Sequence, residues 1–248
     1  MILRMTPDAL AGMIDHTVLK PEATAADVDR AIAEAVEHRF CSVCISPVFV
    51  AHAAGRLKGT GVRVCTVCGF PNGTSKSIHK AIEATGLVKD GADEVDVVAH
   101  LPHLAVGDVD AARAELIELV RAVRAARRDV VVKVIVESGY LMSLGPDRGE
   151  RAIATACQAV RESGCDFIKT STGFHPTGGA TAEAVRLMKK HGDGLKVKAS
   201  GGMRDLTSTM TMVEAGADRL GMSASVAVVD ELKGRTPAPN TPLAGATY

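Results

Sequence analysis

The sequence has few aromatic residues and no tryptophan, which limits what can fill its core. Only 3% of its 248 residues are Phe, Tyr or Trp, whereas 46% are hydrophobic. Aliphatic side chains must therefore form the interior, as they do in parallel sheets that are covered by helices. The length suits one large core, and a single α/β barrel commonly has about this size.

A net charge is also absent. Lys plus Arg and Asp plus Glu each number 29, so the formal net charge at pH 7 is zero. This balance gives no indication of a nucleic-acid partner, and an anionic substrate would need a local site. No apolar run is long enough to cross a membrane, and residues 1–7 lack the apolar stretch of a signal peptide. We therefore expect a cytoplasmic protein that binds neither nucleic acid nor membrane.

Four of the cysteines form two close pairs, Cys41/Cys44 and Cys65/Cys68, with 20 residues between the pairs. This spacing superficially fits a zinc site with four thiolates. Both pairs, however, lie in segments with strand character, where positions i and i+3 point to opposite faces. We therefore favour reduced cysteines that pack in the core and expect no metal. An interaction module built on zinc is the alternative, which metal analysis would identify.

Short strand-like segments alternate with longer helical patterns along most of the chain. A Gly-Ala-Asp or Gly-Cys-Asp segment leads into a strand at three places, and its glycine can end the preceding helix. The expected strands are residues 13–19, 42–46, 62–68, 94–99, 130–137, 166–170, 195–200 and 219–222. The expected helices named by their apolar stripes are residues 25–40, 109–127, 148–163, 180–191 and 205–215.

A strand and a helix that repeat about eight times predict a parallel sheet, because each crossover returns the chain in the same direction. An open sheet would usually have a nucleotide-binding loop, and the chain has neither Gly-x-Gly-x-x-Gly nor a Walker loop. We therefore predict a single (β/α)8 barrel, or TIM barrel, over residues 1–232. Residues 233–248, with three prolines, are expected to form a flexible tail.

Active sites of such barrels lie at the C-terminal ends of the strands. Lys169 lies in the sixth expected strand and Lys198 in the seventh, about 4.8 Å away across the sheet. A lone lysine in a strand is more often structural, but two adjacent ammonium groups repel. Each would then favour losing its proton and becoming a nucleophile. Asp96 points to the same mouth from the fourth strand and could exchange protons with the site, directly or through water.

Glycines follow the last two strands, as Gly201-Gly202 and Gly221-x-Ser223. Phosphate sites of this fold are often built there, and glycine lets the backbone approach an anion closely. Plain tight turns are the alternative. The other strand ends present the remaining candidates for binding a substrate: Asp15, Thr17, Cys44, Lys133, Thr172 and Gly173.

From about Ile14 to Val229 the chain resembles the deoxyribose-phosphate aldolase family. Phe-Ile-Lys-Thr-Ser-Thr-Gly-Phe at 167–174 and Lys-Ala-Ser-Gly-Gly at 198–202 are specific signatures, because they occur together at the spacing of one βα unit. The other matching segments are residues 14–21, 42–47, 69–73, 92–98 and 132–137.

The resemblance implies a class I aldolase that reversibly cleaves 2-deoxy-D-ribose 5-phosphate to acetaldehyde and D-glyceraldehyde 3-phosphate, a step of deoxynucleoside catabolism. Lys169 would form the Schiff base, Lys198 would tune its pKa, and Asp96 would take part in proton transfer. No metal or organic cofactor is implied. Some members end in a mobile tail whose terminal tyrosine helps proton transfer, which would correspond to Tyr248. Barrels of this kind often dimerise, so a homo-oligomer, with a dimer favoured, is expected.

Three places depart from the family pattern. Residues 99–100 are Ala-His where members often have Ile-Asn, and residues 144–151 look like a loop insertion. Family members often have two adjacent serines where this chain has Ser223-Ala224, so the second hydroxyl is missing, which would weaken phosphate binding.

Two further functions are consistent with the same residues. A transaldolase-like enzyme would share the lysine but take a different donor, so comparing acetaldehyde with dihydroxyacetone would separate the two. A catalytically silent barrel with a binding role is the other, and borohydride trapping would exclude it.

Overall fold

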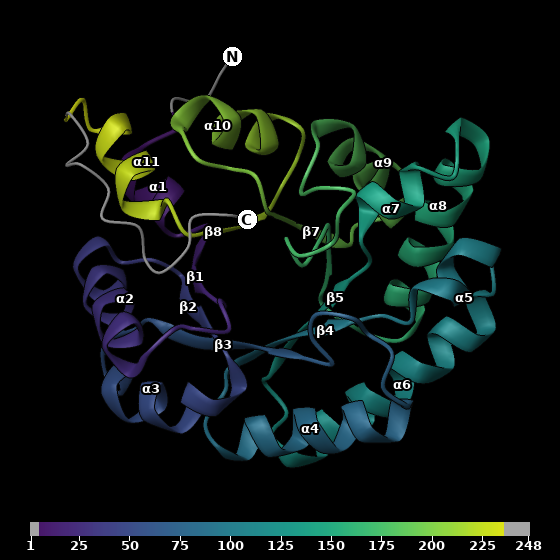
Figure 1. Cartoon of the computed structure of the whole chain (residues 1–248), viewed down its shortest axis with the longest axis horizontal. Helices are drawn as coiled ribbons and strands as arrows, with labels where there is room; N and C mark the ends of the chain where they lie inside the picture. Colours follow the sequence, from purple (N-terminus) through teal and green to yellow (C-terminus); the bar gives the residue numbers. More distant parts are fainter. Residues whose placement is uncertain (1–4, 236–248) are drawn as a thin grey trace.

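The computed structural model describes residues 5–235, in which the strands form a closed barrel. Each strand pairs in parallel with the next one, and the last pairs with the first (Figure 1). The strands are β1 (Ile14–Val18), β2 (Ser42–Ile45), β3 (Arg63–Cys68), β4 (Glu94–Val98), β5 (Val131–Ile135), β6 (Phe167–Lys169), β7 (Lys196–Ser200) and β8 (Arg219–Met222). Each lies within its expected segment, and the predicted (β/α)8 barrel is confirmed. Residues 236–248 of the expected tail, with Tyr248, lie outside the described part.

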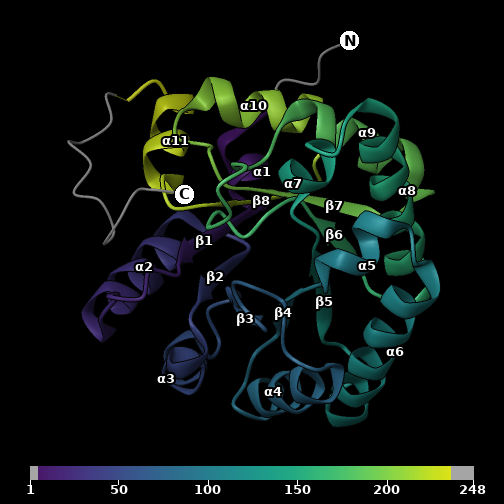
Figure 2. The same cartoon turned by 45° about the vertical axis from the view of Figure 1, so that its right-hand side comes forward.

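Helices surround this barrel, as two views of the chain show (Figures 1 and 2). They are α1 (Pro7–Ala11), α2 (Ala25–His38), α3 (Val50–Leu57), α4 (Ser77–Lys89), α5 (Leu101–Val106), α6 (Val109–Ala126), α7 (Ser138–Met142), α8 (Pro146–Glu162), α9 (Ala182–Gly192), α10 (Leu206–Glu214) and α11 (Ser225–Leu232), with a 3-10 turn at Pro47–Phe49. Within residues 5–235, no helix is long and apolar enough to cross a membrane.

The five helices expected from their apolar stripes are present to within a few residues. The loop insertion expected at residues 144–151 is wrong, because α8 begins at Pro146 and continues through this stretch. Proline is well placed there, since the first turn of a helix does not need its missing N–H group.

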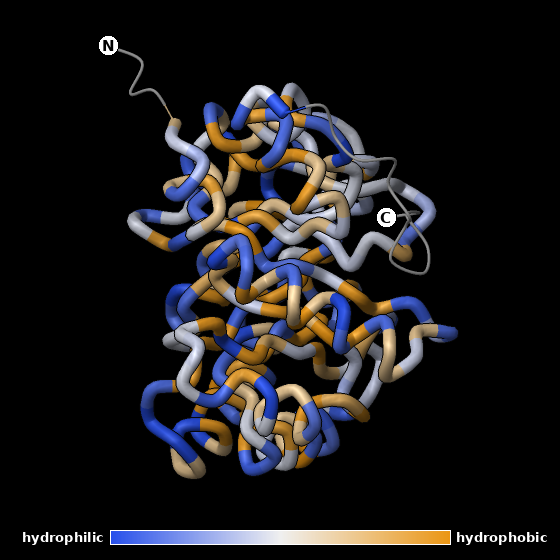
Figure 3. The backbone as a smooth tube through the Cα atoms, turned by 90° about the vertical axis from the view of Figure 1, so that its left-hand side faces the viewer, coloured by the Kyte–Doolittle hydropathy of each residue, from blue (hydrophilic) through white to orange (hydrophobic). Residues whose placement is uncertain are grey.

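The strands separate two kinds of interior. On β4 all five residues are buried, and Val95 and Val97 join the same apolar cluster as Leu116 of α6. The alternate residues, Glu94 and Asp96, take part in ion pairs inside the barrel. Aliphatic side chains therefore hold the helices to the barrel, while its inside carries charge. Figure 3 shows the matching alternation of hydrophobic and hydrophilic stretches along the chain.

Candidate active site

The barrel interior brings Lys169, Lys198 and Asp96 together. The pairing of β6 with β7 sets Lys169 opposite Lys198. The Nζ atoms of both lysines lie 2.8 Å from the same oxygen, Oδ2 of Asp96. Lys198 and Asp96 are fully buried, and Lys169 retains 3% exposure. Two amines that share one carboxylate oxygen form a connected path along which a proton can move.

Lys133 connects this group to two further carboxylates. Its Nζ lies 2.7 Å from Oδ1 of Asp96, 2.6 Å from Oε2 of Glu94 and 3.6 Å from Oδ2 of Asp15. Asp15 in turn lies 2.5 Å from the Nζ of Lys198. Asp15 and Lys133, expected to bind the substrate, are fully buried within this network.

Glu94 and Arg219 belong to the network, and sequence reasoning missed both. One guanidinium nitrogen of Arg219 lies 2.7 Å from Oδ1 of Asp15 and 3.1 Å from Oε2 of Glu94. The available signal was the alternation of Glu94 with Asp96 in a strand whose other residues are valines. A charge on the inner face of a buried strand needs a partner across the barrel.

The pKa shifts follow from these contacts. Burial raises the pKa of the Asp96 carboxyl, but the ammonium groups of Lys133, Lys169 and Lys198 outweigh burial and hold it well below its usual value. Burial likewise lowers the pKa of Lys198, but the carboxylates of Asp15 and Asp96 outweigh burial and raise it. The expectation that repulsion makes Lys198 lose its proton is therefore wrong, because two carboxylates lie closer to it than was foreseen.

The cysteines do not converge on one ion. The Sγ of Cys68 lies under α4, 3.3 Å from the carbonyl oxygen of Lys80, whereas Cys44 and Cys65 pack together inside the barrel. Cys65 joins Cys44 and Asp96 in a triplet with suitable spacing for a metal ion. The Nζ of Lys133 already lies 3.3 Å from the Sγ of Cys65 and 2.7 Å from Asp96. A positive group therefore already occupies this position, and the zinc site considered as an alternative lacks two of its four thiolates, those of Cys41 and Cys68.

The loop after β6 lines the mouth of the barrel. The N–H of Thr172 donates to Oε1 of Glu137 at 2.7 Å, and the hydroxyl of Thr170 donates to the carbonyl of Ser200 at 3.1 Å. Gly173 follows with a φ of 83°. These bonds tie the loops after β5, β6 and β7 to one another, so that the segment next to Lys169 is held in one conformation.

Glycine is required at two positions on this rim. A Cβ on Gly221 would lie 2.3 Å from the Oγ of Ser200 and 3.0 Å from the Cε of Lys198, so only glycine leaves space for that lysine. Gly201 has a φ of 85°, and its Cβ would lie 3.1 Å from the Oγ of Ser171. The next residue, Gly202, has a φ of 87°. The ends of β7 and β8 therefore present bare backbone to the mouth.

Helix α11 begins just beyond β8, and no side chain caps its first turn. Ser223 precedes it and is partly exposed. The first N–H groups of a helix lack partners within the helix and favour an anion. Thr17 lies across from this end, on β1, and its hydroxyl donates to the carbonyl of Asp15 at 2.8 Å. The rim formed by β1, β7 and β8 can therefore accept a negatively charged group.

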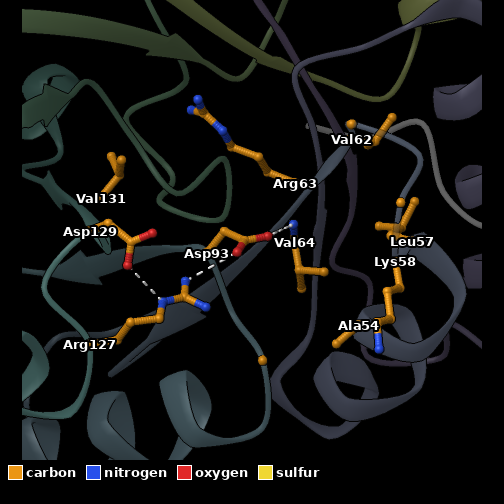
Figure 4. Close-up of a pocket in the computed structure, with 13 residues that line it drawn as sticks. Ala54, Leu57, Lys58, Val62, Arg63, Val64, Asp93, Arg127, Asp129 and Val131 are labelled. Carbon is orange, nitrogen blue, oxygen red and sulfur yellow. Dashed lines mark hydrogen bonds and ion pairs between the residues drawn. The ribbon is translucent and has the colours of Figure 1, made fainter.

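The opposite end of the barrel carries a cavity of about 530 Å³ where β3, β4 and β5 begin (Figure 4). Arg127 lies there between Asp93 and Asp129, with nitrogen–oxygen distances of 3.1 and 3.2 Å. Arg63 leads from this cavity into the barrel and contacts Glu94 at 2.9 Å. These side chains are paired with one another at the N-terminal ends of the strands, where barrels are stabilised rather than catalytically active. The candidate active site is the other end.

A family model described as DeoC/LacD family aldolase matches residues 10–229. The chain belongs to this aldolase family. A deoxyribose-phosphate aldolase of Thermoanaerobacter sp. (strain X514) is 48% identical over 223 residues, which are 90% of this chain and 96% of that protein. The protein of the same name from Mycolicibacterium paratuberculosis (strain ATCC BAA-968 / K-10) is 47% identical over 231 residues, 92% of this chain and all of that one.

Solved structures agree with the DeoC/LacD assignment. The deoxyribose phosphate aldolase from Aeropyrum pernix, whose structure is described as tetrameric, superposes with a TM-score of 0.81 at 34% identity, covering 92% of each chain. The resemblance drawn from the sequence motifs is thereby confirmed at the level of family and fold. An aldolase needs a way to stabilise a carbanion, and the buried lysines supply a candidate.

Proposed function

We propose that this DeoC/LacD aldolase reversibly cleaves 2-deoxy-D-ribose 5-phosphate to acetaldehyde and D-glyceraldehyde 3-phosphate through a Schiff base on Lys169. The observation that carries the proposal is the shared contact of Lys169 and Lys198 with one oxygen of Asp96 inside a buried network. Relatives of known name, 47–48% identical over nine-tenths of the chain, support the substrate.

Charge counting explains why Lys169 is the nucleophile. Asp15, Glu94 and Asp96 supply three negative charges, the buried Lys133, Lys198 and Arg219 supply three positive ones, and Arg63 contacts Glu94 from the half-exposed end. These carboxylates are therefore already matched by cations without counting Lys169. Of Lys133, Lys169 and Lys198, Lys169 contacts the fewest carboxylates among residues 5–235, with Asp96 alone. It is also the only one of the three with any exposed surface, at 3%.

The reaction then proceeds in balanced steps. The neutral amine of Lys169 adds to the C1 aldehyde of the open-chain sugar, and the carbinolamine takes one proton from the site and loses water to give a protonated imine; hydrolysis later returns this proton. A base takes the proton of the C3 hydroxyl, the C2–C3 bond breaks, and its electron pair moves into the imine to give an enamine. Protonation of the enamine carbon and hydrolysis release acetaldehyde and restore the amine. In this scheme Asp96 and Lys198, with a water molecule, carry the protons.

The phosphate group is assigned to the rim of β7 and β8. Gly201, Gly202, Gly221 and Ser223 provide backbone N–H groups and a hydroxyl beside the uncapped start of α11. The remaining substrate contacts are assigned to Thr17, Thr172 and Gly173 around the mouth. Asp15, Cys44 and Lys133, which the sequence also suggested for substrate binding, are fully buried and are assigned to the barrel interior beneath the mouth. Tyr248 is proposed to assist proton transfer at the enamine, as the family resemblance implies.

Covalent trapping tests the assignment of Lys169. Incubation with acetaldehyde and borohydride should add a reduced two-carbon group to one lysine, which peptide mass spectrometry should locate at position 169. Lys80→Arg is a matched control, because Lys80 is equally buried but lies outside the barrel against Glu115. Labelling that persists in Lys169→Met, or none in the native protein, would contradict the mechanism.

Two broader properties belong to the same proposal. All six cysteines are free, which suits the reducing cytoplasm. A homo-oligomer, with a dimer favoured, is part of the proposal; the relative from Aeropyrum pernix, described as tetrameric, supports assembly in general. Light scattering of the purified protein would measure the assembly, and a monomer would contradict it.

A further inference from the structure

His16 is a buried histidine that the proposed mechanism does not use. It lies on β1 between Asp15 and Thr17, and successive residues of a strand point to opposite faces. Its ring therefore points out of the barrel, into the space between β1 and the helices α2 and α11, which lie next to β1 in Figure 1. It is fully buried there, against the ring of Phe40 at 5.3 Å.

Both ring nitrogens of His16 have polar partners. The Nδ1 lies 2.9 Å from the Oγ of Ser225, the first residue of α11, and the Nε2 lies 2.7 Å from Oε2 of Glu34 on α2. A buried imidazole with a partner at each nitrogen has a fixed ring orientation, and the bonds connect two helices through one strand residue.

The donor and acceptor roles of the Ser225 hydroxyl follow from its second contact. Its hydroxyl donates to the carbonyl oxygen of Met222 at 3.1 Å, so its oxygen is left to accept from the Nδ1–H of His16. The Nε2 on the other side of the ring lies 2.7 Å from Oε2 of Glu34, a distance typical of a short hydrogen bond to a carboxylate.

This chain of bonds ends at the rim assigned to phosphate. Met222 is the last residue of β8 and pairs in register with His16, and Ser223 lies between Met222 and Ser225. The Ser225 hydroxyl thus links the end of β8 to the start of α11. Ser225 has no exposed surface, so it acts on the rim through position and not through contact with the sugar.

We propose that His16, held by Glu34, is a positioning residue that fixes Ser225 and thereby aligns Ser223 and the first turn of α11 on the phosphate of the substrate. The inference rests on the proposed function, because it needs a phosphorylated substrate at this rim. It adds a set of contacts behind the rim, on the outer side of β1.

The test compares a phosphorylated with an unphosphorylated sugar. Ser225→Ala and His16→Gln should raise the KM for 2-deoxyribose 5-phosphate by about 5- to 10-fold, the typical effect of one buried hydrogen bond. The kcat/KM for 2-deoxyribose should stay unchanged, because that sugar has no group for the rim to hold. Inhibition by inorganic phosphate should weaken by a similar factor, which reports binding without chemistry.

His38→Gln is the matched control. The ring of His38 also contacts Phe40, at 5.4 Å, but its Nδ1 has no hydrogen-bond partner among residues 5–235. This variant should keep both kinetic constants. If His16→Gln does not fold, Glu34→Ala serves instead, because Glu34 is partly exposed and alanine removes the oxygen that holds the Nε2 of His16.

The outcomes distinguish failure of the role proposed for His16 from failure of the proposed aldolase function. Equal losses on both sugars, or no loss on either, would show that His16 is only structural and would overturn the inference while leaving the aldolase proposal intact. A native protein that cleaves neither sugar would overturn the proposed function, and the role of His16 with it.

Discussion

Two regions of this molecule bury lysine side chains, and they do so differently. Lys80 lies outside the barrel, where its Nζ pairs with Glu115 of α6 and donates to the carbonyl of Val98 at 2.7 Å. Inside the barrel, Lys169 and Lys198 share one oxygen of Asp96. Burial alone therefore does not distinguish a reactive lysine. Lys80 is paired with the carboxylate of one neighbouring helix, whereas Lys169 shares the carboxylate of Asp96 with Lys133 and Lys198.

The largest expected effect is at the shared carboxylate. Lys169→Met should lower kcat by about 10⁴-fold or more, since loss of a covalent nucleophile removes the reaction path and not only a contact. Steady-state cleavage of 2-deoxyribose 5-phosphate measures it. Lys80→Met, tested beside it, should retain kcat per folded molecule, and a comparable loss in that variant would erase the distinction between the two regions.

Lys198→Leu should lower turnover by about 10² or more, the usual contribution of an acid–base group. It should also move the acidic limb of the pH–rate profile to higher pH. Lys198 is one of three ammonium groups that depress the pKa of Asp96, so its removal lets that pKa rise toward its usual value. A pH–rate profile identical to that of the native protein would refute this coupling.

For the Lys80–Glu115 pair we expect an effect on stability and not on activity. Lys80→Met should lower the free energy of unfolding by about 3 kcal/mol, because Glu115, whose side chain is only 9% exposed, loses its cation and keeps the N–H of His100. The double variant Lys80→Met with Glu115→Leu should recover much of this loss, which urea unfolding would measure. No recovery in the double variant would mean that the pair is not what stabilises this region.

The smallest effect is expected at the phosphate rim. Ser223→Ala should raise the KM for 2-deoxyribose 5-phosphate by roughly 3- to 10-fold, in line with loss of one hydrogen bond to a charged group. The KM for unphosphorylated 2-deoxyribose should not change. Equal effects on the two sugars would place the phosphate elsewhere on the rim.

The sequence predicted the barrel and its adjacent lysines because both depend on local patterns. Lys169 and Lys198 lie on neighbouring strands, so their proximity follows from strand order alone. Arg219 and Glu94 were missed because they meet across the barrel, from strands that are not adjacent. Such contacts depend on how strand tilt and stagger close the sheet, which no local pattern reports.

Other errors have equally specific causes. Helix α4 was not named in advance, because Lys80 is buried on it while Ile82 is 63% exposed, which reverses the usual apolar stripe. The pKa of Lys198 was expected to be lowered but is raised. The expectation placed Asp15 at the mouth and not beside that lysine, which it contacts. In both cases an ion pair, invisible in the order of residues, decided the outcome.

The contact of Arg219 with Asp15 and Glu94 has a consequence for how the barrel closes. The two carboxylates and the guanidinium come from β1, β4 and β8, so this ion pair requires that the last strand has joined the first. A chain in which β8 has not paired with β1 lacks this cation against two buried carboxylates, which disfavours their burial. Closing the sheet and burying these charges are therefore coupled steps.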